Sequence, residues 1–506
     1  MSDQAAPTRS ITSRVAAGAA WMVAWRVVSR ALGFISVLIL ANLLVPADFG
    51  IVAVAIAVSA AVEGMFQFGV RDALVRLQGE HRDYYDAAFT IQVVRGLVTA
   101  TLIAAVSGIA ATSMSEPRVS SILLVFAALT AVSGFENIGI VAFSRELNFR
   151  IIFLLQAAPR IVGFTVTVAM AFLLHSYWAL IVGGAIAKLS GIAVSYVMSP
   201  HRPRFGMAGW RYLVHFSFWT WVGGLVLVVL QRADSFLLAP MLGTSAFGLY
   251  VLAGEIAALP VTELLEPACI ALFPGFALAG RGGTVPAKMG LSVAGALMLF
   301  TVPFSAGISA SSGYLVMGLL GPQWEAAQPL IAVLAWSCMF LPFSWVTVTA
   351  LSAQGHVRQV VASHAIAAAL KVAAILAVRW TNDLHVITVA MVAVVAVESL
   401  MFIWQLWYAG NRELRQLVMT VARLLPSLAI TVAALSFFPG VWTNVQPGRF
   451  QALITGGGIG AFTFVVFFLC QATLWHVAGQ PAGPERRIVD LLASNPYLSR
   501  WWSRIW

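Results

Sequence analysis

Long runs of apolar residues, separated by short polar connections, fill almost the whole of this sequence. A helix needs about 20 consecutive apolar residues to cross the hydrocarbon core of a bilayer, and most of these runs reach that length. We therefore predict an all-α integral membrane protein with about fourteen transmembrane helices. The predicted ranges are 17–42, 48–70, 86–110, 119–142, 151–174, 177–198, 211–238, 246–272, 288–310, 327–350, 359–378, 384–408, 420–438 and 452–475.

The composition agrees with a chain that has lipid as its main solvent. Of its residues, 60% are hydrophobic and 10% are charged, whereas soluble domains have about 25% charged residues. Cys269, Cys338 and Cys470 lie in apolar runs, which favours buried apolar side chains over disulfides or metal ligands. The N-terminal region lacks the pattern of a cleaved secretory signal, so we expect insertion to begin with the first helix.

The cations between the apolar runs are distributed unevenly. When the connections are assigned alternately to the two sides of the membrane, one side holds 20 Lys and Arg residues and the other holds 3. Loops rich in Lys and Arg stay in the cytoplasm, so we predict that both termini are cytoplasmic. Because the cations are scattered rather than gathered into one basic domain, the net charge of +10 does not indicate nucleic-acid binding.

An internal repeat indicates how the helices are grouped. LLVPADFG at 43–50 and MLGTSAFG at 241–248 each close one predicted helix and open the next. Two such repeats predict two pseudo-symmetric six-helix lobes that enclose a site, followed by two additional helices. The predicted divisions are 1–200 for the first lobe, 201–410 for the second, 411–476 for the additional helices and 477–506 for a basic, aromatic cytoplasmic tail, which is either an interfacial helix or disordered.

Apart from charges in the first turn of a range, fourteen charged residues lie inside the predicted helices. Each would cost about 2.5–3.5 kcal/mol at the centre of a lipid-facing helix, so most must face a cavity or one another. The cations, which we take as a candidate substrate-binding set, are Arg26, Arg30, Arg95, Arg160, Lys188, Arg232 and Lys371. The acids are Glu63, Glu136, Asp234, Glu255, Glu263, Glu266 and Glu398.

Two of these cations have a spacing that suits a diphosphate. Arg26 and Arg30 are four residues apart, which places both guanidinium groups on one face of the first helix. Guanidinium groups bind phosphate oxygens in pairs and stay ionised, so a cavity lined by them would attract an anionic headgroup. Two alternatives stay open: the cations pair with helix acids, or they extend to the membrane surface.

The acids indicate a second possible role. Glu255 precedes Pro260 in a segment that we expect to be kinked, and Asp234 lies two residues from Arg232, so these two do not form a simple local pair. With Glu63, these acids are our candidates for ion coupling. No spacing of His, Cys or carboxylate indicates a metal site, and no motif indicates a cofactor or catalytic residues.

Several segments resemble the Wzx-type polysaccharide flippases of the multidrug/oligosaccharidyl-lipid/polysaccharide (MOP) superfamily. They are RALGFISVLILANLLVPADFGIVAVA at 30–55, HRPRF at 201–205, FSFWTW at 216–221, RADSFLLAPMLGTSAFGLYVLAGEIAALP at 232–260 and LFPGFA at 272–277. The resemblance covers about residues 10–420. It implies a V-shaped, two-lobe fold and a cationic cavity at Arg26, Arg30 and Arg232, with Arg95, Arg160, Lys188 and Lys371 as additions.

The resemblance also implies an activity. Such a protein would carry undecaprenyl-diphosphate-linked oligosaccharide from the cytoplasmic to the periplasmic leaflet for exopolysaccharide, capsule or O-antigen synthesis. Alternating access, driven by ion antiport, would move the substrate. Membrane lipids would surround the protein, and a polysaccharide polymerase and chain-length proteins are its candidate protein partners.

Two other functions are less well supported by the sequence. A multidrug exporter of the same superfamily would be expected to use an acidic cavity, but the first predicted lobe has five intramembrane cations against two acids. A membrane ligase or polymerase would need catalytic carboxylates or histidines on a sizeable periplasmic face, and the predicted outer loops are short. We therefore expect a transporter rather than an enzyme.

Overall fold

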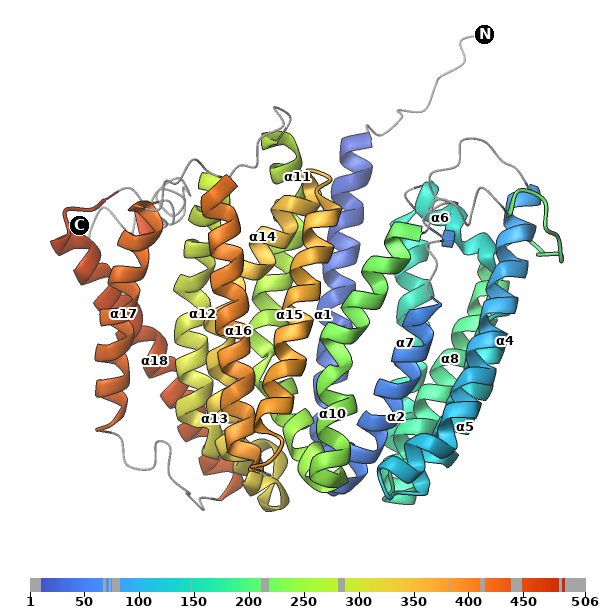
Figure 1. Ribbon diagram of the computed structural model, residues 1–506, viewed down its shortest axis with the longest axis horizontal. Helices are drawn as coiled ribbons and strands as arrows, with labels where there is room; N and C mark the ends of the chain where they lie inside the picture. The colour runs from blue at the N-terminus through green and yellow to red at the C-terminus, as the bar shows by residue number, and fades with distance from the viewer. Residues whose placement is uncertain are drawn as a thin grey trace, which may run out of the picture. The chain divides into compact units, whose positions relative to one another are not determined.

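The described chain is helical throughout and forms two compact units. The computed structural model describes residues 11–66, 70–71, 74, 82–146, 148–210, 218–280, 287–381, 383–409, 415–437, 448–481 and 485–486, and all regular structure in these ranges is helical (Figure 1). The units comprise residues 1–248 and 249–506. This boundary lies inside a helix and differs from the lobe boundary predicted after residue 200, which stays a prediction.

The first unit contains the helices that correspond to the first seven predicted ranges. They are α1 (Ile11–Leu43), α2 (Pro46–Met65), α4 (Arg82–Ser113), α5 (Arg118–Ser133), the short 3-10 turn Ile138–Ile140, α6 (Val141–Arg145), α7 (Phe149–Leu174), α8 (Trp178–Met198) and the first part of α10 (Phe218–Ala257).

The residues at the start of two of these helices explain why the helices begin there. Pro46 stands in the first turn of α2 after the extended residue Val45, and Asn148 caps α7 with its side chain.

Small residues allow helices of this unit to approach closely. Gly163 of α7 lies against Ala187 of α8, and Gly183 of α8 lies against Thr167 of α7. Such contacts are typical of helix pairs in lipid, where close van der Waals packing replaces the hydrophobic effect as the main source of association. The contact further along α7 is made by the residue that comes earlier in α8, so α7 and α8 pack antiparallel.

The fourth predicted helix, 119–142, is not continuous. The chain bends by 67° between Arg118–Ser133 and Ile138–Arg145. The bend exposes backbone carbonyls, and the buried side chain of Gln92 donates hydrogen bonds to the carbonyls of Gly134 (3.1 Å) and Glu136 (2.9 Å). Because α4 supplies these partners, the break can lie inside the protein without unsatisfied polar groups.

The second unit begins with the last part of α10 and contains a longer series of helices. They are a π turn (Val261–Leu265), α11 (Glu266–Ala279), α12 (Ala287–Leu315), a π turn (Val316–Leu320), a 3-10 turn (Pro322–Ala327), α13 (Gln328–Leu334), a 3-10 turn (Ala335–Met339), α14 (Leu341–Ala353), α15 (Val357–Val378), α16 (Leu384–Ala409), α17 (Arg415–Leu435) and α18 (Arg449–Val477). Its largest core cluster includes Leu265, Phe276, Leu299 and Cys338.

The number of helices that could span a membrane is somewhat lower than the predicted fourteen. Each of the fourteen predicted ranges overlaps a helix, but in the described residues ten helices are long and apolar enough to span, or twelve if each of two bent pairs is one span. Two predicted ranges meet in α10, which is interrupted at Gly243 (φ 75°). The tenth range, 327–350, is bent by 43°. The count of fourteen stays a prediction.

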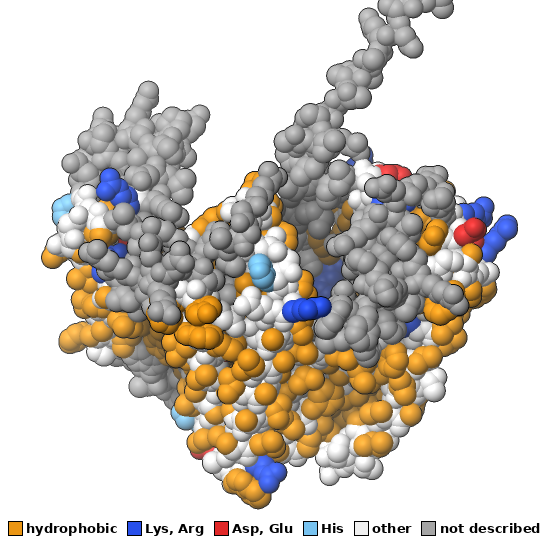
Figure 2. Space-filling model, turned by 45° about the horizontal axis from the view of Figure 1, so that its top comes forward, with side chains coloured by type: hydrophobic (Ala, Val, Ile, Leu, Met, Phe, Trp, Pro, Cys, Tyr) orange, Lys and Arg blue, Asp and Glu red, His pale blue; other side chains and the backbone are white. Residues whose placement is uncertain are grey.

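The described surface suits a lipid environment. Large apolar side chains are exposed along the helices, among them Ile109 (67% exposed) and Leu173 (72% exposed), and Figure 2 shows hydrophobic side chains over much of the visible described surface. Cys269 and Cys338 are buried, as predicted, and Cys470 is partly buried. The predicted tail lies mostly outside the described residues, beyond the short helical segment 485–486.

Candidate functional site

Three of the candidate arginines lie on two neighbouring helices of the first unit. The rings of Trp25 in α1 and Phe153 in α7 pack edge to face, with centroids 6.0 Å apart. Further along both helices, the guanidinium of Arg160 in α7 lies so close to Gly33 in α1 that a Cβ there would be 3.1 Å from its Nη2. The helices therefore run side by side in the same direction.

This packing brings Arg160 toward the paired arginines of α1. Arg26, Arg30 and Gly33 follow the i, i+4, i+7 spacing of one helix face. Arg160 approaches that face at Gly33, which is about one turn beyond Arg30. Arg26 and Arg30 are partly exposed and Arg160 is exposed. In the sequence these three arginines were separate candidates. In the fold they lie on neighbouring parts of α1 and α7.

A second group of charges links four helices of the same unit. Lys188 Nζ of α8 lies 3.6 Å from Glu63 Oε1 of α2, and the Thr130 hydroxyl of α5 donates a 2.7 Å hydrogen bond to the same carboxylate oxygen. The two charged side chains are 37% and 42% exposed. Arg95 of α4 is close enough to Glu63 for an electrostatic interaction. Lys188 therefore lies beside a helix acid in the structure.

The break after α5 adds a second ion pair to this group. Arg71 Nη2 donates to Glu136 Oε2 at 2.6 Å, with side chains 49% and 29% exposed. Arg95 also interacts electrostatically with both of these residues. We call Glu63, Arg71, Arg95, Glu136 and Lys188 the acid–base cluster.

Sequence reasoning missed two members of the acid–base cluster. Arg71 was assigned to a loop, and Glu136 was recognised as an intramembrane acid but not proposed for the site. A signal was present for Glu136, because Gly134 two residues earlier favours a break in an apolar helix.

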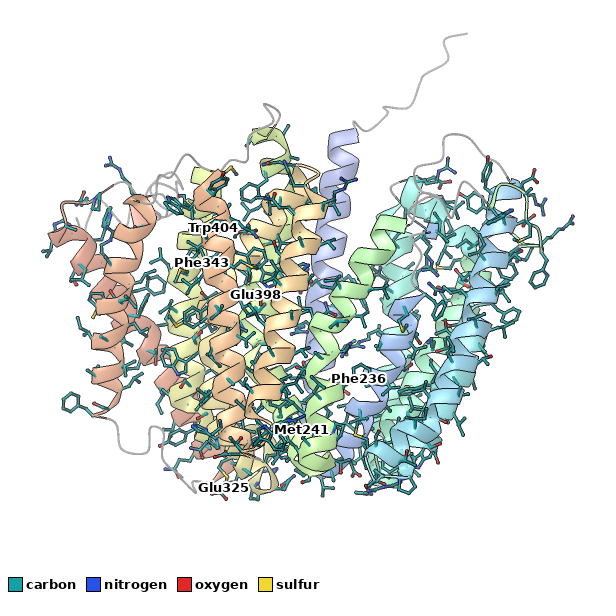
Figure 3. All side chains as sticks on the ribbon, in the orientation of Figure 1. Phe236, Met241, Glu325, Phe343, Glu398 and Trp404 are labelled. Atoms are coloured by element: carbon teal, nitrogen blue, oxygen red, sulfur yellow. The ribbon has the colours of Figure 1, made fainter. Side chains whose placement is uncertain are left out.

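The other candidate residues lie on α10, α15 and α16. Arg232 and Asp234 are partly buried in α10, and Asp234 accepts a 3.0 Å hydrogen bond from the backbone N–H of Ser235. Glu255 is exposed in the last part of α10. In the second unit, Lys371 of α15 interacts electrostatically with Glu398 of α16, which Figure 3 shows midway along its helix.

The segment after α8 is fastened to the start of α4. Asp86 Oδ1 accepts a 2.9 Å hydrogen bond from the backbone N–H of Arg204 and lies 3.6 Å from His201 Nε2. The Thr90 hydroxyl accepts a 2.9 Å hydrogen bond from the backbone N–H of Gly206. The segment 201–206 is therefore held against α4 by specific polar contacts.

Protonation of His201 should loosen this attachment. Burial lowers the pKa of His201, an effect that Arg82 and Arg202 reinforce and Asp86 opposes. A lowered pKa means that the folded protein favours the neutral ring, so its stabilising effect is full above the unfolded value of about 6.5 and falls as pH drops below it. Between pH 7 and pH 5, we expect the melting temperature of His201→Gln to fall less than that of the wild type. Equal slopes in a thermal melt would contradict this assignment.

The charged groups suit anion binding better than covalent chemistry. No group of three or more His, Cys, Asp or Glu side chains in the described part of the chain could hold a metal ion. What the first unit offers is several cations from different helices, partly open to solvent and partly balanced by carboxylates. Such an arrangement can bind and release an anionic group, because guanidinium and ammonium groups stay charged without a chemical step.

Solved structures show which fold this is. The chain resembles the lipid II flippase MurJ in an inward closed conformation, with a TM-score of 0.69, 12% sequence identity and coverage of 90% of this chain and 99% of MurJ. It also resembles an inward-facing multidrug resistance MATE family transporter of the MOP superfamily, with a TM-score of 0.56, 13% identity and coverage of 81% and 96%. The fold is therefore that of MOP-type transporters.

Two curated proteins are similar in sequence. The succinoglycan biosynthesis transport protein ExoT of Rhizobium meliloti (strain 1021) is 25% identical over 324 residues, which cover 62% of this chain and 65% of ExoT. The lipopolysaccharide biosynthesis protein WzxC of Escherichia coli (strain K12) is 21% identical over 341 residues, covering 64% and 67%. The match thus spans about two thirds of the length of each relative.

The family assignment rests on the larger part of the chain. The polysaccharide biosynthesis protein family matches residues 39–329, a stretch that includes α2 to α12 and most of the charged residues described above. Together with the relatives, this match confirms the predicted resemblance to Wzx-type proteins. This multi-pass membrane chain belongs to the polysaccharide biosynthesis protein family.

Proposed function

We propose that this protein is a flippase that carries polyprenyl-diphosphate-linked oligosaccharide from the cytoplasmic to the periplasmic leaflet of the bacterial inner membrane. The observation that carries this proposal is the set of partly exposed cations inside the first unit, on helices otherwise composed of apolar residues. Charges of this kind are costly in a membrane and mark substrate pathways. The names of ExoT, WzxC and MurJ, which refer to polysaccharide biosynthesis and lipid flipping, support the same substrate class.

The arginines of α1 and α7 are our candidates for the first contact with the diphosphate. Arg26, Arg30 and Arg160 supply guanidinium groups that can each bind two phosphate oxygens. Their position on adjoining faces of two helices would let one diphosphate bridge them without large movement. Arg232 and Lys371 are further candidate contacts from the set predicted by the sequence.

The proposal also covers the orientation of the protein in the membrane and the energy source for transport. The cation distribution of 20 against 3 supports cytoplasmic termini, because Lys and Arg are retained on the cytoplasmic side. Ion coupling would use an acid that changes its partner during transport, and Glu63 has the most suitable surroundings among our candidates, since it already contacts Lys188 and Thr130. Asp234 and Glu255 are the other candidates. A polysaccharide polymerase and chain-length proteins would act on the delivered substrate.

Deleting the gene from its host tests the activity. Lipid-linked repeat units should accumulate on the cytoplasmic leaflet, and the restored gene should return polymer to the cell surface. Because the fold is also shared with a MATE transporter, the same strain should be tested for sensitivity to cationic drugs. Increased drug sensitivity with normal polymer output would favour a multidrug exporter instead.

The paired arginines should be necessary for this transport. Losing one charged hydrogen-bonded contact should lower transport about tenfold, so Arg30→Ala should impair polymer output and Arg26→Ala/Arg30→Ala should impair it more. Protein level in the membrane should be unchanged, because both side chains are partly exposed. Arg379→Ala is the matched control, since Arg379 lies over the ring of Trp380 in a turn. Full polymer output from a well-expressed double variant would refute the role.

A further inference from the structure

Two carboxylates occupy the positions where an anionic substrate would meet the acid–base cluster. Glu63 lies against Lys188, and Glu136 lies against Arg71. Arg95 interacts electrostatically with both acids. Each carboxylate thus holds a negative charge beside the cations that a diphosphate would otherwise use, and the three cations are largely balanced before any substrate arrives.

The contacts of these acids are suited to exchange. Both ion pairs are partly exposed, with the four side chains between 29% and 49% exposed, so neither pair is locked by burial. The contrast within the same chain is the pair formed by Arg423 and Glu485, whose side chains are only 9% and 7% exposed. A solvent-exposed pair can be opened by a competing anion, whereas a buried pair cannot be opened without stranding a charge.

Neutral neighbours would hold one acid once its cation is taken. The hydroxyl of Thr130 donates to Glu63 at 2.7 Å, and that of Ser59 lies at 3.5 Å. Glu63 therefore keeps a hydrogen-bond partner without Lys188. At the other ion pair, Gln92 Nε2 donates a 2.9 Å hydrogen bond to the backbone carbonyl of Glu136, which fixes the backbone there. Gln92 Oε1 lies 3.5 Å from Arg71 Nη2. The acids can be displaced from the cations without losing their place in the fold.

We propose that Glu63 and Glu136 are displaceable counter-anions of the substrate site. In the empty protein they neutralise Lys188, Arg71 and Arg95, the arriving diphosphate takes over these cations, and the returning carboxylates promote its release. This inference rests on the proposed function, because it assigns the regulation of the same site. It also explains why acids are present in a site for an anion: transport requires binding strong enough for entry and weak enough for exit.

Direct binding of a soluble prenyl diphosphate tests the exchange. Farnesyl diphosphate would be titrated by calorimetry into the purified, detergent-solubilised full chain. We expect Glu63→Gln and Glu136→Gln each to bind it about fivefold more tightly than the wild type, which is the factor expected for removing one competing, solvent-exposed ion pair. Glutamine keeps the size and the hydrogen-bonding ability of the side chain, and each variant removes one of the two ion pairs.

Tighter binding could also come from the more positive net charge of the variants. A matched control and a double-mutant cycle distinguish this effect from the loss of a competing carboxylate. Glu116 pairs with Arg118 at 2.7 Å at the turn between α4 and α5, away from the acid–base cluster. Glu116→Gln removes the same charge and should leave the affinity unchanged. The gain from Glu63→Gln should also shrink when Lys188→Gln is already present, because the acid then has one cation fewer to compete for.

The outcomes distinguish this inference from the function on which it rests. Tighter binding by both variants, with no change in Glu116→Gln, supports the exchange. If the wild type binds farnesyl diphosphate and both variants bind it equally or more weakly, the exchange is wrong and the proposed function stands. If neither the wild type nor the variants bind it, the proposed function fails and this inference fails with it.

Discussion

Replacing Gly50 or Gly248 with alanine should destabilise the first unit by about 1–3 kcal/mol, the usual cost of overpacking. A Cβ at Gly50 would overlap the backbone carbonyl oxygen of Thr244, and a Cβ at Gly248 would overlap that of Pro46. Backbone atoms cannot turn aside as a flexible side chain can, so α2 and α10 would have to separate. We expect a lower melting temperature for each variant in detergent and a lower yield of protein in the membrane.

The reciprocity of this contact makes the prediction specific. Pro46 and Thr244 are 198 residues apart, as are Gly50 and Gly248, and this is the spacing of the repeated segments 43–50 and 241–248. Each copy of the repeat therefore places its glycine on the equivalent carbonyl of the other copy. The double variant Gly50→Ala/Gly248→Ala should be less destabilised than the sum of the single variants, because the first separation already makes room for the second methyl group.

Gly184 provides the control for this pair. It lies in α8 of the same unit, is exposed, and a Cβ there would have no neighbour within 4 Å. Alanine at this position should leave the melting temperature unchanged or raise it slightly, since alanine favours a helix by about 1 kcal/mol over glycine. If Gly50→Ala and Gly248→Ala melt like Gly184→Ala, the close approach of α2 and α10 does not occur in the protein.

The helices were largely predictable from the sequence, but only some of their breaks were. Apolar runs of spanning length mark positions where lipid dictates a helix, and every predicted range overlaps one. The break after α5 depends instead on Gln92, which lies 42 residues before Gly134, the nearer of the two residues whose carbonyls it binds. A local pattern carries no information about such a partner. The interruption at Gly243 was predicted, because it falls between the predicted ranges 211–238 and 246–272.

The sequence was enough to identify the charged residues of the candidate site, but it was not enough to predict which of them lie together. A charge inside an apolar run is visible in the sequence because it is costly, and this identified Arg26, Arg30 and Lys188. Which acid faces which cation depends on helix packing: Lys188 meets Glu63 across 125 residues of sequence. Arg423 shows the opposite error. We counted it among the cytoplasmic loop cations, yet it is buried in α17 and paired with Glu485.

That buried pair gives the second large effect: Glu485→Ala should lower the free energy of unfolding of the second unit by about 3–5 kcal/mol. Nε and Nη2 of Arg423 donate to Glu485 Oε1 at 3.1 and 2.9 Å, and Gln471 Nε2 donates to the same oxygen at 3.0 Å. The Ser427 hydroxyl completes the network by donating to Gln471 at 2.7 Å. Without Glu485, the guanidinium of Arg423 stays buried with no counter-charge, and its desolvation is no longer offset.

A thermal melt that follows α17 and α18 would measure this effect, and the exposed pair of Glu116 and Arg118 supplies the comparison. Its side chains are 17% and 47% exposed, so Glu116→Ala should cost at most about 1 kcal/mol. Replacing both partners, as in Arg423→Met/Glu485→Met, should recover much of the loss, because no buried charge is then left unpaired. A melting temperature for Glu485→Ala equal to that of Glu116→Ala would mean that water reaches Arg423, and the segment after α18 would then not be held by this pair.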